Sequence, residues 1–542
     1  MITSPPPVSE PQRLDAAHLA SEIEKRFGQA ISPVTTDCSG DACFLVKHAP
    51  TLKPLCQFLF WESGWSFGGL IVEEHSQHWD LRYVFLIPGC GWTHFILRLP
   101  LRIETVPSIS AQIHAADWYE REAEDLFGLH FEEHPRLGDF VLHDQVWQEG
   151  LTPMRRTFDA RQMHLERRPR ENWHPVLVVQ DPGAFAMPIG PVYEGGVGEP
   201  VHFLLETVGE DVIRAAPRLF YKYRAVEKIA EGKPVSDVLL LAERFAATSA
   251  FAHSLAFCQA VEHALDMVVP RRARILRVLL AELERLRHHA GAIEGICQST
   301  ALSVPEAHAA IIEEQLLRAS CVFAGHRYLF GLNTPGGLRR NFDSRACSQL
   351  LHAVDEASKQ LRQLEERLRF SSSFLDRLEQ VGTIDCASAR DLDLVGPVGR
   401  ASGLSHDLRR IYPYSGYDQY HFDVACEQEG DGYARLRVLF FETRQSVALI
   451  HQSVAFLAEP GDICAPMNRP AAAIRSGWVE APIGAAMHWV RLDQTGRVVQ
   501  YRILSPSFRN WLGLHVAVED FAFQDFPIIL ATLALSVAEC DR

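Results

Sequence analysis

The stretch that decides the fold is residues 271–298, RRARILRVLLAELERLRHHAGAIEGICQ. Acids and bases alternate with apolar residues that recur at helical spacing on one stripe: Ile275, Leu279, Leu283 and Leu286. Pro270 stands just before the stretch, at a position typical of a helix start. The stretch therefore predicts a long helix whose apolar stripe packs against other helices in a bundle.

Helical patterns continue on both sides of this stretch, and strand patterns lie toward the two ends of the chain. Further helices are predicted at 16–28, 209–232, 236–267, 305–331, 344–377 and 434–458. Apolar runs bounded by Gly, Pro and Ser predict strands at 55–62, 79–88, 93–101, 477–493 and 496–506. The predicted fold class is an α+β N-terminal domain (1–150), an Arg/Pro-rich strap (151–187), and a mainly α-helical bundle domain with peripheral β-strands (188–542).

The composition is that of a globular, acidic protein. Of 542 residues, 47% are hydrophobic and 22% are charged, a balance that can bury a large core. The net charge of −15 repels phosphate backbones, so no nucleic-acid partner is expected. The first residues lack a secretory signal pattern, and no apolar run reaches the ~18 residues that cross a bilayer. These features predict a cytosolic or peripheral protein.

The 12 cysteines are scattered singly along the chain, and no C-x-x-C pair occurs anywhere. At this density they are expected to be reduced core thiols rather than a disulfide framework. Soft metal centres need deprotonated thiolates, so the absence of C-x-x-C pairs argues against a thiolate-bound metal site.

Two groups of motifs resemble subunits of respiratory complex I. DWYEREAEDLFGLHFEEHP (117–135) resembles the signature of the 30 kDa-type subunit, and EGLTPMRR (149–156) matches its basic closing segment. From about 188 onward the chain resembles the 49 kDa-type subunit and the related large subunit of nickel–iron hydrogenases. The matching segments follow family order: PIGPVYEG (188–195), ELERLRHH (282–289), LVGPVGRASGL (394–404), DLRRIYPYSGY (407–417) and VEAPIGA (479–485). The fusion looks most like the large subunit of formate hydrogenlyase and related energy-converting hydrogenases.

The resemblance implies a peripheral subunit of an oxidoreductase complex on the cytoplasmic face of a membrane. The expected partners are a small iron–sulfur subunit with a 4Fe–4S cluster, a ferredoxin-like subunit and integral membrane subunits that translocate protons or other ions. The segment DWYEREAEDLF (117–127) is assigned to subunit docking. No cofactor is expected to be bound by this chain itself, and a quinone is a candidate ligand because complex I uses the same hollow for a quinone headgroup.

The family's metal ligands are replaced in this sequence. The early motif, usually R-V-C-G-I-C-G-F-A-H-S, reads RFAATSAFAHS (244–254), which puts Ala246 and Ser249 at the thiolate positions. The late motif, usually I-D-P-C-x-x-C-T-x-R, reads LALSVAECDR (533–542), which puts Ser536 and Glu539 there. A one-residue slip would bring Cys540 to one ligand position only. The arginine over the metal in the family's E-A-P-R-G is Ile483 here, so no nickel or iron is expected.

Other residues are candidates for the quinone or proton chemistry that the resemblance implies. Tyr193, His202 and His253 are candidates to replace the family's quinone-binding Tyr and His. Arg224 and Glu227 lie three apart, which fits either an intrahelical ion pair or a proton path. Asp393 and Asp407 fit either proton conduits or, more commonly, exposed loop carboxylates.

Three functions remain open from the sequence. In the first, the hollow accepts a quinone or another redox partner near the docked cluster. In the second, the hollow is redox-inert and the chain is a scaffold or conformational coupler for ion movement. In the third, the chain is a hydrogenase with unusual ligands such as His253, Glu539 and Cys540.

Overall fold

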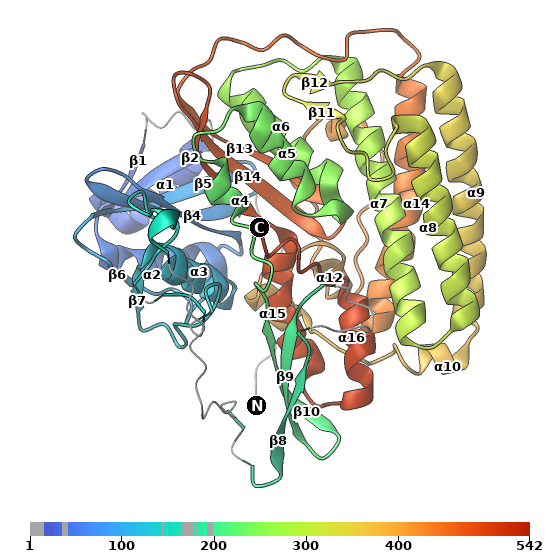
Figure 1. Ribbon diagram of the computed structural model, residues 1–542, viewed down its shortest axis with the longest axis horizontal. Coiled ribbons are helices and arrows are strands. Elements are labelled where there is room, and N and C mark those ends of the chain that lie inside the picture. The colour runs from blue at the N-terminus through green and yellow to red at the C-terminus, as the bar shows by residue number, and fades with distance from the viewer. Residues whose placement is uncertain are drawn as a thin grey trace. The chain divides into compact units, whose positions relative to one another are not determined.

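The computed structural model describes residues 16–34, 42–143, 146–148, 150–163, 178–179, 181–191 and 199–542. The chain forms two compact units. Unit 1 comprises residues 1–138 and 154–158, and unit 2 comprises residues 139–153 and 159–542. Figure 1 labels the helices and strands of both units.

Unit 1 is built on a five-stranded sheet with the strand order β1-β2-β5-β4-β3. β2 and β5 run parallel, and the other neighbours pair antiparallel. The strands are β1 (Ile31–Pro33), β2 (Ala42–Val46), β3 (Ser66–Glu74), β4 (His78–Ile87) and β5 (Gly91–Pro100), and β6 (Thr105–Pro107) pairs separately with β7 (His130–Glu132). The helices are α1 (Ala16–Phe27), α2 (Leu52–Gln57) and α3 (Asp117–Phe127).

The strand predictions for unit 1 are partly right. The strands at 79–88 and 93–101 are confirmed as β4 and β5, and the helix at 16–28 is confirmed as α1. The strand at 55–62 is wrong, because α2 and a π-helical turn (Phe58–Glu62) occupy it. The buried residues there recur at helical spacing: Leu52, Leu55, Cys56 and Leu59. A short apolar run does not by itself separate helix from strand, and the preceding Leu52 completes the helical stripe.

The motif DWYEREAEDLF forms α3, whose side chains belong to the core. Trp118, Tyr119, Leu126 and Phe127 are buried, and so is the carboxylate of Glu120. Glu120 accepts hydrogen bonds from Ile109 N (2.8 Å) and Ser108 Oγ (2.5 Å), and burial raises its pKa to about 7. The motif therefore has a structural role in this chain, and its use in subunit docking stays a prediction.

Unit 2 contains the predicted helical bundle. The four long helices α7, α8, α9 and α14 lie side by side (Figure 1), with α7 packed between α8 and α14. The predicted stripe of α7 is confirmed, because Ile275, Leu279, Leu283 and Leu286 are all buried. The helices of unit 2 are α4 (Val226–Ala230), α5 (Val235–Arg244), α6 (Ala250–Ala264), α7 (Arg271–Ser299), α8 (Ser303–Ala324), α9 (Ser344–Arg369), α10 (Ser372–Leu375), α11 (Cys386–Asp391), α12 (Gly396–Ala401), α13 (Leu408–Ile411), α14 (Gly432–Phe456), α15 (Pro506–Val518) and α16 (Phe526–Leu533).

Among the described residues, no helix combines the length and the apolar composition that crossing a bilayer requires.

Antiparallel sheets accompany these helices. One sheet has the order β16-β10-β9-β8, and another is the meander β13-β14-β15. α6 packs on β13 and β14 so closely that a Cβ at Gly477 would lie 2.0 Å from Ala256 O. The strands are β8 (Ala184–Ile189), β9 (His202–Val208), β10 (Asp211–Arg218), β11 (Asn333–Thr334), β12 (Gly337–Leu338), β13 (Ala473–Ala481), β14 (Gly484–Leu492), β15 (Val498–Leu504) and β16 (Phe521–Ala522).

The prediction of mixed helices and strands is confirmed, and two element predictions in unit 2 are corrected. The helix at 209–232 is wrong, because β10 fills its first half and α4 is confined to five residues. The helix at 236–267 is interrupted between α5 and α6. Ala246 adopts an extended backbone (φ −135°, ψ 94°) and is followed by the 3₁₀ turn Ala247–Ser249. This interruption creates the corner on which the candidate site is built.

Candidate functional site

Three segments of unit 2 meet at the predicted hollow. The first is the corner Phe245–Ser249 with the start of α6, the second is the pair of strands β14 and β15, and the third is the buried segment 536–542 that follows α16. The long helices hold the first segment in place through Glu284 of α7. Its carboxylate accepts hydrogen bonds from Phe251 N (2.7 Å) and Ala252 N (2.9 Å), which are unpaired donors of the first turn of α6.

A buried chain of hydrogen bonds joins these segments. Tyr501 Oη lies 2.7 Å from His488 Nδ1, His488 Nε2 lies 3.0 Å from His253 Nδ1, and His253 Nε2 lies 3.3 Å from Glu539 Oε1. All four side chains are fully buried. We call Tyr501, His488, His253 and Glu539 the pocket chain.

The protonation of the pocket chain follows from its surroundings. Burial would raise the pKa of Glu539, but the hydrogen bond and charge of His253 hold it below its usual value, so Glu539 is a carboxylate that accepts. Burial, together with the charges of His253 and Arg542, lowers the pKa of His488 well below its usual value. Burial also raises the pKa of Tyr501, which keeps its proton. Tyr501 therefore donates to Nδ1 of the neutral His488, and Glu539 accepts at the other end of the chain.

The positions that carry thiolates in the family are filled by small or hydrogen-bonded side chains. Ala246 and Ser249 are buried, and the Ser249 hydroxyl has no hydrogen-bond partner. Ser536 Oγ accepts from Glu539 N (3.3 Å), and Ser507 N donates to Glu539 Oε2 (3.1 Å). Ile483 is also buried, and its carbonyl is so close to Gly396 that a Cβ there would lie 1.8 Å away.

These residues do not fit the nickel–iron centre that the resemblance implies. Such a centre needs soft thiolates, and the thiol that the late motif offers, Cys540, has a pKa raised well above its usual value by burial. Its Sγ lies 3.7 Å from the carbonyl oxygen of Ser536, a hydrogen bond to protein. Among the described residues, the ligand atoms of His253, Glu539 and Cys540 do not come together within 4.8 Å of one another. The geometry therefore disfavours the hydrogenase with unusual ligands.

Arg224 and Glu227 do not form the intrahelical pair that their spacing allowed. Ala225 has a left-handed backbone (φ 52°) and precedes α4, so Arg224 lies outside the helix. Arg224 Nη1 instead donates to Phe245 O (3.2 Å) and Ala538 O (3.3 Å), which ties the early segment to the late one. Glu227 accepts from Ile503 N (2.7 Å) and Arg542 Nε (3.2 Å). Both residues thus join the segments that surround the pocket chain, and neither is hydrogen-bonded to the pocket chain itself.

Two other predicted residues lie apart from the pocket chain. His202 begins β9 opposite Arg218, and burial and the charge of Arg218 lower its pKa. No hydrogen bond or ion pair connects the described His202 to the pocket chain. Tyr193 lies outside the described residues.

Several residues of the site were not predicted from the sequence. His488 and Tyr501 lie inside predicted strands, and Glu199 stands just before β9. Glu199 accepts hydrogen bonds from Val537 N and from Ala538 N (3.0 Å), and burial raises its pKa. Asp541 accepts from Phe220 N (2.8 Å), and burial raises its pKa to about 6. A histidine in the middle of the otherwise apolar stretch of β14 is the one signal that the sequence offered.

A second buried polar group, the α7 ionic cluster, joins α7 and α14 of the bundle to α12, α13 and β13. Arg400 donates to Glu442 Oε1 (2.7 Å) and Glu480 Oε1 (2.8 Å), and Arg409 Nη1 donates to Glu282 Oε1 (3.0 Å). The charge of Arg409 holds the pKa of Glu282 below its usual value, although burial alone would raise it. The members of the cluster are Glu282, Arg285, His289, Arg400, Asp407, Arg409, Glu442 and Glu480.

Two carboxylates that were expected to be exposed in loops are buried, and one of them, Asp407, belongs to the α7 ionic cluster. Asp407 and Asp393 are both buried, at 1% and 5% exposure, rather than exposed. Asp407 pairs with Arg409 (2.7 Å), and Asp393 pairs with Arg509. Arg285 donates to Ala481 O (3.1 Å), which fixes the backbone two residues before Ile483.

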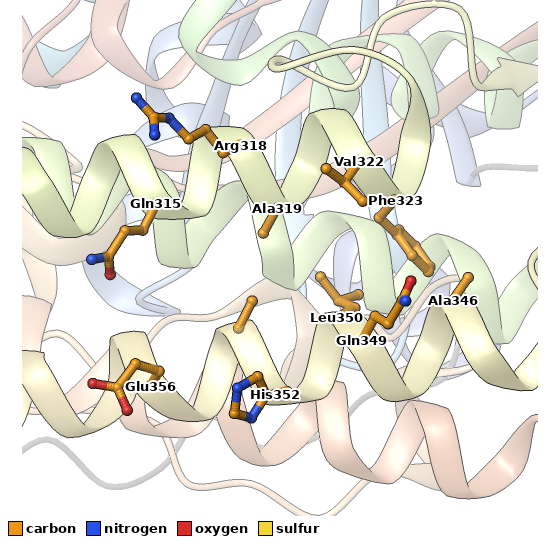
Figure 2. Close-up of a pocket in the computed structure, with 11 residues that line it drawn as sticks. Gln315, Arg318, Ala319, Val322, Phe323, Ala346, Gln349, Leu350, His352 and Glu356 are labelled. Carbon is orange, nitrogen blue, oxygen red and sulfur yellow. The ribbon is translucent and has the colours of Figure 1, made fainter.

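A pocket of about 390 Å³ lies away from these groups, between α8 and α9. Figure 2 shows Phe323 and Leu350 on its wall, with Gln315, Gln349 and His352 around it. None of the predicted site residues lines this pocket.

Comparisons with known families agree with the motif assignments. The family profile of the 30 Kd subunit of respiratory-chain NADH dehydrogenase matches residues 46–164, and that of the 49 Kd subunit matches residues 309–476. The profile of nickel-dependent hydrogenases matches residues 224–290, which include the early degenerate motif and most of α7. The chain is therefore a fusion of 30 kDa-type and 49 kDa-type complex I domains, as its motifs predicted.

Individual relatives give the same assignment. The chain is 28% identical over 499 residues to formate hydrogenlyase subunit 5 of Escherichia coli, a match that covers 91% of this chain and 87% of that protein. It is 29% identical over 499 residues to hydrogenase-4 component G of the same organism, with 91% and 86% covered. It is also 30% identical over 368 residues to the C/D subunit of NADH-quinone oxidoreductase from Bdellovibrio bacteriovorus, with 66% and 64% covered. These homologues are subunits of hydrogenase-related and complex I-like oxidoreductases.

Proposed function

We propose that this chain is the large subunit, without a metal centre of its own, of a membrane-associated oxidoreductase complex related to formate hydrogenlyase and complex I. In this proposal it lies on the cytoplasmic face, docks a small 4Fe–4S subunit and a ferredoxin-like subunit, and contacts integral membrane subunits that translocate ions. Its own role is to couple electron transfer in those partners to ion movement. The names of its relatives, two hydrogenase-related and one NADH-quinone oxidoreductase, support the type of complex.

The observation that carries the proposal is the hydrogen bond between His253 and Glu539. It joins the early and late segments at the place where the family binds its metal, and Ala246, Ser249 and Ser536 supply no thiolate. Because the side chains there bond to one another and to backbone amides, they support a proton-holding core rather than a metal cage.

Purification from the native host tests both parts of the proposal. The complex would be isolated through a tag at the amino end, since residues 537–542 are buried except Ala538. We expect mass spectrometry to identify an iron–sulfur subunit and membrane subunits, and elemental analysis to find iron but no stoichiometric nickel. Stoichiometric nickel, or hydrogen uptake with an artificial acceptor, would contradict the proposal.

Restoring the thiolates is a sharper test. The combined variant A246C/S249C/S536C/E539C should not gain hydrogen turnover, because the arginine position remains Ile483. The matched control adds I483R to the same four changes. Hydrogen turnover in the four-cysteine variant would contradict the proposal, because four substitutions would then be enough to restore the metal site.

Quinone reduction is a second candidate function. His253, His488 and Tyr501 supply three polar side chains in one buried place, as a quinone headgroup site would need. Both rings of the histidine pair already have partners at their two nitrogens, so a quinone would have to displace one of these bonds. Saturable binding of a short-chain quinone that H253A abolishes and H202A preserves would favour this function over the coupler.

A further inference from the structure

A separate cluster of ligand-type side chains lies in unit 1, on the hairpin of β3 and β4. The sequence there is EEHSQHWD (73–80), and the register pairs Glu73 with Asp80 and Glu74 with Trp79. His75 and His78 therefore flank the turn, and His75 N donates to His78 O (2.9 Å). Since side chains alternate along a strand, Glu73, His75, His78 and Asp80 project from the same face of the hairpin.

The geometry of this face is already close to that of a metal site. The two imidazole rings stack with centroids 4.4 Å apart and an interplanar angle of 13°. Asp80 Oδ2 lies 3.5 Å from His75 Nε2, and Asp80 Oδ1 lies 3.6 Å from His78 Nε2. Ligands of a tetrahedral zinc ion with bonds of about 2.1 Å lie about 3.4 Å apart. Among the described residues, this is the one group of His, Cys, Asp and Glu with three ligand atoms within 4.8 Å of one another.

One ring nitrogen of the cluster lacks a hydrogen bond. His78 Nε2 is buried and has no hydrogen-bond partner, although Asp80 is nearby. A buried polar atom without a partner costs free energy unless a water or an ion satisfies it. The lone pair of a neutral imidazole is a preferred ligand of zinc and similar divalent ions.

We propose that His75, His78 and Asp80 bind one divalent transition-metal ion of the zinc class, with solvent at the remaining position. Nitrogen and carboxylate ligands favour such an ion over the oxygen-only coordination of calcium or magnesium. The ion would fasten the turn of the β3–β4 hairpin, far in the sequence from the pocket chain, and it has no part in electron transfer.

Arg98 completes the site as a neighbour of the ligand carboxylate. Its Nε and Nη2 each lie 2.7 Å from an oxygen of Asp80. Hydrogen bonds of this kind orient metal-ligating carboxylates. The guanidinium is half exposed and keeps its hydration, which limits its repulsion of a bound cation.

The test is metal titration of the full chain. The protein is stripped with a chelator and its cysteines are alkylated, because exposed thiols would bind zinc on their own. Four of the thiols that the structure describes are exposed: Cys321, Cys386, Cys426 and Cys464. Zinc binding is measured by calorimetry, and Co²⁺ binding by its visible absorption. H75Q and H78Q remove ligands, and H48Q replaces an exposed histidine of the same unit as the matched control.

We expect one equivalent of zinc in the native protein and in H48Q, a tetrahedral Co²⁺ spectrum, and affinity weakened about tenfold or more in H75Q and H78Q. Zinc should also slow amide hydrogen exchange in residues 73–80 of the native protein. This measurement does not depend on the folding of any variant. Equal affinities in all four proteins, or the absence of saturable binding in the native protein, would overturn the proposal. Circular dichroism of the metal-free variants checks that they fold.

Discussion

The two buried polar regions of unit 2 stabilise their buried carboxylates in different ways. In the α7 ionic cluster each carboxylate meets a guanidinium, so burial is offset by opposite charge, as for Arg400 with Glu442 and Glu480. The pocket chain has one carboxylate, Glu539, which meets an imidazole and a backbone amide. Arginine fixes a charge at every accessible pH, whereas an imidazole can gain or lose a proton. The α7 ionic cluster is therefore a frame of fixed charges, whereas the pocket chain is a region that can hold protons.

Removing a guanidinium from the α7 ionic cluster should have the largest effect. Arg400→Met leaves Glu442 and Glu480 buried without their cation, and the expected loss in the free energy of unfolding is about 3–5 kcal/mol. Urea denaturation measures this loss. The matched control is Arg318→Met, which breaks the exposed pair with Glu314 and should cost less than about 0.5 kcal/mol. Similar losses in both variants would show that the cluster is no stronger than a surface pair.

Glu284 connects the two regions, since it lies on α7 and accepts from the first turn of α6. Burial raises its pKa to about 7, above the 4.5 of an unfolded chain, so the folded state holds the proton more tightly. The protein should therefore lose stability as pH rises from about 4.5 to about 7. Glu284→Gln removes this dependence, and its stability relative to the native protein should rise by up to about 3 kcal/mol between pH ~5 and pH ~8. Denaturation of both proteins at the two pH values measures this change. A stability difference that stays the same at both pH values would contradict the raised pKa of Glu284.

Glu539 should show the opposite dependence on pH. Its pKa in the folded state is lowered, so its contribution is present above the unfolded value of 4.5 and is lost as pH falls through the folded value. Glu539→Gln loses an acceptor for Ser507 N and should cost about 1–3 kcal/mol near neutral pH. The cost should shrink in acid. Glu519→Gln, at an exposed carboxylate of the same unit, should change stability by less than about 0.5 kcal/mol at either pH.

The smallest effect is expected at Ser249. Its hydroxyl is buried without a partner beside the pocket chain, so Ser249→Ala removes a polar atom that makes no hydrogen bond. Thermal unfolding should show no loss, and a gain of up to about 1 kcal/mol. A clear loss of stability would mean that the hydroxyl binds an ordered water or another polar group near the pocket chain.

Much of the fold could be predicted from local patterns, because apolar residues recur there with the spacing of a helix or a strand. The stripe of α7 and the strands at 79–88 and 93–101 are long and regular, and the structure confirms them. The error at 55–62 arose because a short apolar run fits either a helix or a strand. The helix predicted at 209–232 failed because strand pairing with β9 decides the conformation of β10.

The candidate site was predicted less completely. The assignment of the replaced ligand positions stays a prediction, but the structure brings one of them, Glu539, to His253 across 286 positions of the sequence. His488 and Tyr501 were missed because each lies in a strand that looks structural, and only the packing of α6 on β13 and β14 turns them toward His253. Arg224 and Glu227 were paired by spacing, but the left-handed Ala225 separates them.

The sequence by itself determined that no C-x-x-C pair occurs and that isoleucine stands at position 483, and the proposal of a large subunit without a metal centre starts from these two facts. It also determined the fused order of the two complex I-type domains. Only the tertiary structure decided what occupies that place instead, because a hydrogen bond between residues far apart in the chain depends on how helices and sheets pack, and no local period encodes it.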